Sequence, residues 1–335
     1  LQQYETDGES IEASSLIIQD NNSEEFRVIN GQDLYEWELS EDQLYATGMI
    51  AEQRITAAIA SIQGGSQTTA YFVTGHGEMN VTEEYYLADT LESDGYKVAS
   101  YDLVYNNAAL TDKDCLLFLS PTTDLTDEEY QITKEFIDNG GRAVYLINLL
   151  AGELKNFGKL FEDFGLILED DLIVEADSKY YLNSQIMIKP ELNEESPALR
   201  SIMEADAGVV LPRCRGISVE DKENIELIPI AYSSESSYGK VNPYTETLEK
   251  EEGDTAGPFL LGVTAENSQT GAKMLLMGNN DFVSTLVIQP KTLVSAPLNI
   301  TSTAASYRLK VLVIAVIPIL ILIFGSIVWR RRLSR

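Results

Sequence analysis

Short apolar runs alternate with longer amphipathic stretches between residues 66 and 170. The apolar runs predict buried strands at 69–75, 96–101, 115–120 and 142–148. Helical spacing of apolar residues predicts helices at 83–93, 126–139 and 154–164, each followed closely by a glycine. Thr126 and Glu129 also have the spacing of a capping box at the start of the second helix. This alternation predicts βαβ units, and hence an α/β fold with a doubly wound, mostly parallel sheet.

The flanking segments follow other patterns. Residues 1–65 predict a partial N-terminal region, with a hairpin at 14–20 and 25–31 and a helix at 50–62. Strand patterns dominate residues 171–290, which we interpret as a β-rich continuation whose strands either extend the first sheet or form a part of their own. Residues 291–308 are predicted to be a tether.

The end of the chain has the pattern of a membrane anchor. Residues 311–329 contain no charge, which predicts a transmembrane helix over 309–330. Three arginines follow directly, so residues 331–335 are predicted to be a cytoplasmic basic tail and the body of the protein to lie outside the cell membrane. Export of that body leads us to expect a signal or a first membrane helix before Leu1. The anchor residues are Val311, Pro318, Gly325, Trp329, Arg330, Arg331 and Arg332.

Composition narrows the possible partners. The chain has 24 basic and 53 acidic residues and a net charge of −29, which argues against a nucleic-acid partner. Its two cysteines, Cys115 and Cys214, leave a single disulfide open but do not form a framework. With one histidine and no D-x-D-x-D-G calcium loop, we expect no metal and no cofactor.

The first candidate site is the run Gly75, His76, Gly77 and Glu78, which follows the first strand of the alternating region. Ligands of open parallel sheets bind beyond the carboxyl ends of strands. His76 is the only histidine, and Glu78 is placed to orient it. Three interpretations remain open, namely a structural turn, ligand recognition and catalysis. Catalysis lacks a nucleophile, because no G-x-S-x-G or G-x-C-x-G motif occurs.

The second candidate site is the run Asn279, Asn280 and Asp281, which follows Gly278 and a predicted strand. These residues either close a turn or line the same crevice as His76.

Four stretches, at 51–62, 70–78, 278–282 and 288–332, together resemble the GldG-type auxiliary proteins of bacterial ABC transport systems. The resemblance implies a flavodoxin-like, class I glutamine-amidotransferase-like domain without that fold's catalytic cysteine, and the turn after 115–120 indeed has none. It also implies a separate ATPase and a permease as partners, with a membrane helix and a further domain before Leu1. The chain departs from the family in one place, because Phe282 runs into Ile288 without the helical segment that members often carry there.

Three hypotheses for function follow. The first is a non-catalytic, membrane-anchored, extracytoplasmic accessory subunit of an ABC transporter; the chain has no G-x-x-x-x-G-K-[ST] motif, so energy must come from another chain. The second is a glycan- or peptide-binding module at the cell surface. The third is a hydrolase that uses His76 and Glu78.

Overall fold

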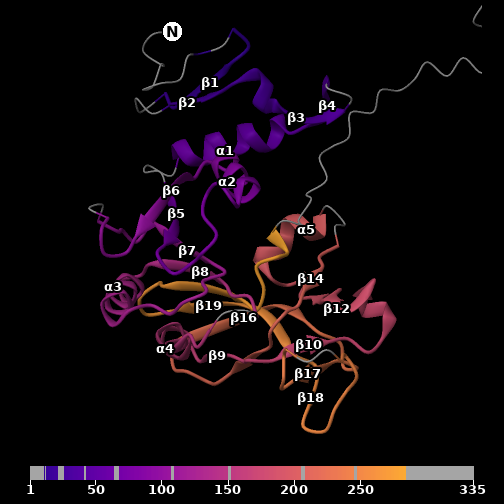
Figure 1. Cartoon of the computed structure of the whole chain (residues 1–335). Coiled ribbons are helices and arrows are strands. Elements are labelled where there is room, and N and C mark those ends of the chain that lie inside the picture. Colours follow the sequence, from indigo (N-terminus) through magenta and orange to yellow (C-terminus); the bar gives the residue numbers. More distant parts are fainter. Residues whose placement is uncertain are drawn as a thin grey trace, which may run out of the picture. The chain divides into compact units, whose positions relative to one another are not determined.

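A ten-stranded mixed sheet organises the chain (Figure 1). The computed structural model describes residues 11, 13–21, 26–40, 43–63, 68–106, 109–149, 152–204, 208–244 and 247–283. The strands follow the order β13-β16-β19-β20-β8-β7-β5-β6, with β15 also paired to β19 and β9 paired to β15. The parallel half holds β6 (Lys97–Asp102), β5 (Thr69–Thr74), β7 (Cys115–Leu119), β8 (Arg142–Leu146) and β20 (Lys273–Met277). The antiparallel half holds β19 (Leu260–Asn267), β16 (Ile225–Tyr232), β13 (Glu191–Leu192), β15 (Ile217–Val219) and β9 (Leu166–Leu168).

The prediction of a doubly wound, mostly parallel sheet is wrong. Beyond β20, every pairing of the sheet among the described residues is antiparallel. The reason lies in the connections. A short turn joins β19 to β20, and a turn of that length allows only an antiparallel pair. Strands from the range 171–290 thus extend the first sheet, while the domain boundaries stay predictions.

Helices cover the two faces of the parallel half. On one face, Phe118 and Tyr145 pack with Phe157 and other residues of α3 (Asp127–Asp138) and α4 (Lys155–Asp163). On the other face, Leu119 packs with Ala88 and other residues of α2 (Tyr85–Ser93). Side chains alternate between the faces because a strand has a period of two.

Two small sheets and a short helix accompany the antiparallel half. One sheet holds β10 (Leu172–Val174), β17 (Tyr238–Lys240) and β18 (Thr255–Ala256), and the other holds β11 (Tyr181–Leu182), β12 (Ser184–Ile188) and β14 (Leu211–Pro212). The short helix is α5 (Arg200–Glu204). Ile173, Ile188 and Leu211 join the hydrophobic cluster on the α2 face, so that face is covered along much of the sheet.

The N-terminal region forms two hairpins and a helix. Strands β1 (Leu16–Gln19) and β2 (Phe26–Ile29) pair antiparallel, which confirms the predicted hairpin. Strands β3 (Tyr35–Ser40) and β4 (Gln43–Met49) form the second hairpin and lead into α1 (Ala51–Gln63). An ion pair of 3.7 Å between Arg54 and Asp89 links α1 to α2.

The predicted membrane anchor requires a correction. No helix within the described ranges is long and apolar enough to cross a membrane; the longest of them, α1, has 13 residues, whereas a spanning helix takes about 20. The span predicted at 309–330 lies beyond residue 283, outside the described residues. We therefore withdraw the predicted C-terminal span and the cell-membrane localisation that was inferred from it. The withdrawn anchor residues are Val311, Pro318, Gly325, Trp329, Arg330, Arg331 and Arg332.

Candidate functional site

The GHGE run lies where the strand order of the sheet reverses. The chain passes from β5 to β6 on one side and then to β7 on the other, so the carboxyl ends of β5 and β7 form a switch point. In open α/β sheets this is the place where ligands bind. Here the two loops close on each other. The backbone N–H groups of Thr122 and Thr123 donate to the His76 carbonyl at 2.8 and 3.0 Å, and the Met79 N–H donates to the Leu119 carbonyl at 2.9 Å.

The two glycines make this closure possible. Gly75 has φ +125° and Gly77 has φ +78°, both in the region that side chains disfavour. A Cβ atom on Gly77 would also collide with the Thr122 hydroxyl. Both glycines are thus required by the turn that places His76 between them.

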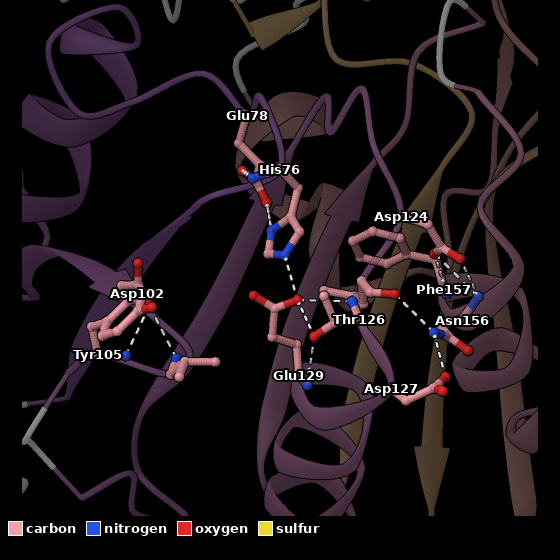
Figure 2. Close-up of polar contacts among 12 residues, drawn as sticks. His76, Glu78, Asp102, Tyr105, Asp124, Thr126, Asp127, Glu129, Asn156 and Phe157 are labelled. Atoms are coloured by element: carbon pink, nitrogen blue, oxygen red, sulfur yellow. Dashed lines mark hydrogen bonds and ion pairs between the residues drawn. The ribbon is translucent and has the colours of Figure 1, made fainter.

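The His76 side chain is held between two carboxylates (Figure 2). Its Nδ1 lies 2.7 Å from Glu78 Oε1, and its backbone N–H donates to Glu78 Oε2 at 2.7 Å. Its Nε2 lies 3.1 Å from Glu129 Oε2, within ion-pair distance. The imidazole and the Glu78 carboxylate are almost completely buried, with 4% and 0% of their side-chain surface exposed. We call these three residues the His76 clamp.

Glu129 belongs both to the clamp and to a helix cap. It comes from the first turn of α3, where Thr126 forms the predicted capping box with it. Thr126 donates its N–H and its hydroxyl to Glu129 Oε2, at 2.7 and 2.6 Å. The clamp therefore ties the loop after β5 to the start of the helix after β7.

The charges of the clamp support one another. Burial by itself lowers the pKa of His76, but the hydrogen bond and charge of Glu78, followed by those of Glu129, outweigh it and raise the pKa to about 9. For Glu129, burial raises the pKa, but the hydrogen bonds from Thr126 and the charge of His76 outweigh it and lower the pKa. At neutral pH His76 is therefore a cation, with both ring nitrogens facing carboxylates. In this state it has no lone pair for a proton or a metal.

This arrangement predicts a loss of stability at alkaline pH. The folded pKa of His76, about 9, lies above the ordinary value of 6.5, so its contribution is fully present below pH 6.5 and is lost as the pH rises toward 9. The expected decrease in the free energy of unfolding is roughly 2–3 kcal/mol. Urea denaturation at pH 6 and at pH 9.5 measures it. An equal decrease in a His76→Ala variant would assign the effect to other groups.

Asp124 supports the clamp from the neighbouring loop (Figure 2). Its carboxylate accepts the backbone N–H groups of Asn156, at 2.8 Å, and Phe157, at 3.2 Å, and so caps the start of α4. The Asn156 amide in turn donates to the Leu125 carbonyl at 2.7 Å. A carboxylate at a helix N-terminus is favourable because the helix dipole is positive there. The Phe157 ring lies edge-on to His76, with centroids 6.4 Å apart.

The second candidate run lies at the end of β20. The Asn280 amide donates to Glu84 Oε1 at 3.1 Å, whereas its buried Oδ1 has no hydrogen-bond partner among the described residues. The Asn280 N–H donates to Asn148 Oδ1 at 2.7 Å, and the Asn148 amide donates to Asp281 Oδ1 at 2.9 Å. Asn279 donates its amide to the Pro212 carbonyl and accepts the Phe282 N–H at 3.0 Å. These side chains bind together the ends of β8 and β20.

The segment between β5 and α2 contains the first candidate run and, through Glu84, also contacts the second. His76 and Glu78 form the clamp with α3, whereas Glu84 contacts Asn280. Burial raises the pKa of Glu84, an effect that the Asn280 hydrogen bond opposes and the charge of Asp281 reinforces. The two runs thus both lie at the carboxyl ends of the parallel strands. No contact between His76 and Asn280 is observed among the described residues.

Sequence reasoning missed three residues that lie near the carboxyl ends of the parallel strands. Asp124 and Asn148 lie in the loops after β7 and β8, and their position after strands in a parallel sheet is the signal that could have marked them. Glu84 carried no signal, because its role depends on Asn280, which is 196 residues away.

The structure offers no other obvious chemistry among the described residues. No group of three or more His, Cys, Asp or Glu residues there could hold a metal ion. Cys115 and Cys214 are both free thiols. Burial raises the pKa of Cys115 to about 12 and also raises that of Cys214, so neither is a thiolate at neutral pH.

Comparisons with known proteins give one family. A model of an ABC transport auxiliary family, described as an ABC-type uncharacterized transport system, matches residues 67–304. No curated protein sequence matches the chain at a significant level. Among solved structures, the mmIFT52 N-terminal domain is similar with a TM-score of 0.45 and 14% identity, over 64% of this chain and 88% of that one. A likeness this low supports no conclusion about fold or function.

Proposed function

The chain belongs to the auxiliary family of ABC-type transport systems, and from this premise we propose that it is a non-catalytic accessory subunit that works with a separate ATPase and a permease. The family match spans the whole described sheet, including the GHGE run and the Asn279–Asp281 edge. The sequence contains no phosphate-binding G-x-x-x-x-G-K-[ST] motif, so the proposal places ATP hydrolysis on a partner chain.

The His76 clamp is the observation that carries the non-catalytic part of the proposal. An enzyme built on this sheet would keep a titratable group free at the switch point. Here the only histidine faces a carboxylate at each ring nitrogen, at 2.7 and 3.1 Å. The clamp thus stabilises the loops instead of offering a base. It holds the loop after β5 against the start of α3.

Co-purification tests the proposal. Full-length tagged protein, isolated from its native cells in a mild detergent, should bring with it an ATPase and a multi-span permease in comparable amounts. A tag-only strain and an unrelated tagged protein are the controls. Recovery of the protein alone, or with cell-wall material, would contradict the accessory role and would favour a surface binding module.

A His76→Gln variant distinguishes a structural role of His76 from a catalytic one. If His76 has no catalytic role, a His76→Gln variant that is still folded at low temperature should bring down the same partners and leave their ATP hydrolysis unchanged. A folded variant that retains the partners but loses transport-coupled hydrolysis would contradict the non-catalytic assignment.

A further inference from the structure

The strand β6 forms one edge of the ten-stranded sheet. Within the described residues it pairs with β5 alone, in a register without a shift from Lys97 to Asp102. The opposite edge strand, β13, has only two residues. Natural sheets shorten, bend or charge their free edges because a long regular edge invites another strand. β6 has six residues, no proline and no bulge.

The direction of the backbone groups of β6 follows from one hydrogen bond. The Lys97 N–H donates to the Thr68 carbonyl at 3.0 Å, so Lys97 faces β5. In a parallel ladder alternate residues face the same neighbour. Ala99 and Tyr101 therefore also face β5, whereas Val98, Ser100 and Asp102 face outward. This alternation defines the free hydrogen-bonding groups of the edge.

Two of the three outward residues, Val98 and Ser100, have backbone N–H and carbonyl groups without a hydrogen-bond partner among the described residues. The Asp102 carbonyl accepts the Asn106 N–H at 3.1 Å, and its carboxylate accepts the N–H groups of Val104 and Tyr105, at 3.0 and 2.9 Å (Figure 2). These bonds end the strand. For the backbone N–H and carbonyl groups of Val98 and Ser100, no partner exists in the part of the chain that the structure describes. A strand that lies alongside β6 would find these four groups.

Exposed apolar side chains stand next to both ends of β6 and on α2. Tyr96 precedes β6, Val104 and Tyr105 follow it, and Tyr86 lies on the adjacent helix α2. Tyr105 and Tyr86 are 83% and 78% exposed. These side chains offer apolar contacts to a chain that lies along β6.

A hollow of about 240 Å³ opens beside β6 on the α3 face. Its apolar wall is formed by Tyr101, Leu110, Ile132 and Phe136. Asp112 and Glu135 are exposed acidic residues of its lining, which holds no basic residue. An apolar hollow with acidic groups fits a lysine or arginine side chain, which packs its stem on apolar surface and keeps its charge near water.

We propose that β6 is a docking edge for an extended segment of a partner protein, which adds a strand to the sheet and places a lysine or arginine side chain in the hollow. Main-chain hydrogen bonds to Val98 and Ser100 would give affinity, and the hollow would give specificity. The proposal does not depend on a role in transport, because neither the outward groups of β6 nor the lining of the hollow includes a residue of the His76 clamp. A second copy of this chain is a poor occupant, since two chains of charge −29 repel each other.

A peptide titration tests the edge. The probe is a fluorescein-labelled decapeptide of alternating lysine and valine. A decapeptide of alternating glutamate and valine is its matched control. We expect the lysine peptide to bind the full chain in a saturable, salt-sensitive way and the glutamate peptide not to bind. Hydrogen exchange should show new protection at the amides of Val98 and Ser100, whereas those of Lys97, Ala99 and Tyr101 are protected beforehand.

Two variants sharpen the test. Ser100→Pro removes an outward N–H but no bond to β5, and should weaken binding roughly tenfold, whereas Ser100→Ala should leave it unchanged. An Asp112→Asn, Glu135→Gln double variant, at two exposed positions, should weaken it roughly fivefold and keeps the test valid if Ser100→Pro does not fold. Absence of binding by the lysine peptide, equal binding of both peptides, or a dimer of the chain that Ser100→Pro abolishes would each overturn the proposal.

Discussion

Replacing His76 with alanine is expected to lower the free energy of unfolding by about 3–5 kcal/mol. The reason is that the two carboxylates of the clamp remain without the cation. Glu78 has none of its side-chain surface exposed, and Glu129 has 14%, so the variant leaves two carboxylates close together without their cation. Removing one partner of a buried ion pair costs more than the pair itself contributes, because the other charge stays buried. Urea denaturation of the wild type and the variant at pH 6 measures the difference.

A matched surface variant is the control for this prediction. Lys134 of α3 forms ion pairs of 3.3 Å with Asp138 on the same helix and 2.8 Å with Asp163 on α4, and all three side chains are at least one-third exposed. Lys134→Ala should therefore change the free energy of unfolding by no more than about 1 kcal/mol. If His76→Ala costs as little as Lys134→Ala, the clamp does not stabilise the fold and the interpretation of His76 as a structural cation fails.

Replacing Phe157 with alanine is expected to cost a similar amount, about 3–5 kcal/mol. Phe157 is fully buried on α4. Its ring lies edge-on to Phe118, with centroids 5.3 Å apart, and to Tyr145, at 6.0 Å. The variant leaves a cavity under His76 and at the centre of the packing between α4 and the sheet. The midpoint of urea unfolding should fall without a change in its slope.

Tyr145→Phe is the matched control for this core. The Tyr145 ring is stacked on Phe118 at 4.8 Å with an interplanar angle of 8°, but its buried hydroxyl finds no hydrogen-bond partner in the part of the chain that the structure describes. Removing that hydroxyl keeps the packing and abolishes an unsatisfied polar group, so stability should stay the same or increase. A large loss in Tyr145→Phe would show that the hydroxyl is satisfied and that the packing argument is incomplete.

The parts of the fold that were predicted correctly are encoded locally. The start of α3 follows from Thr126 and Glu129, whose capping box needs four consecutive residues. The hairpin of β1 and β2 also depends on neighbouring residues. The pairing of β20 with β8 does not, because nothing in either strand's own pattern names its neighbour. For that reason the sequence did not reveal that the antiparallel strands continue the sheet of β8 and β5 through β20.

The same distinction applies to the candidate site. The sequence marks His76 as the only histidine and Glu78 as its neighbour, and both lie in the clamp. Glu129 was recognised only as a capping residue, yet the same carboxylate oxygen also contacts His76. One atom with two roles cannot be inferred from spacing, because the second role appears only when β5 and β7 lie side by side. Whether the predicted residues bind a ligand stays a prediction.

The large separation of β20 from β8 along the sequence has a consequence for biosynthesis. A ribosome makes Arg142 about 130 residues before Lys273, its partner in the parallel ladder. During that interval β8 has β7 on one side and nothing on the other, so the nascent protein carries an open, hydrophobic strand edge. Contacts of such long sequence separation are slow to form. The emerging chain is therefore most exposed to aggregation after β8 and before β20, and this is the interval in which chaperones would matter most.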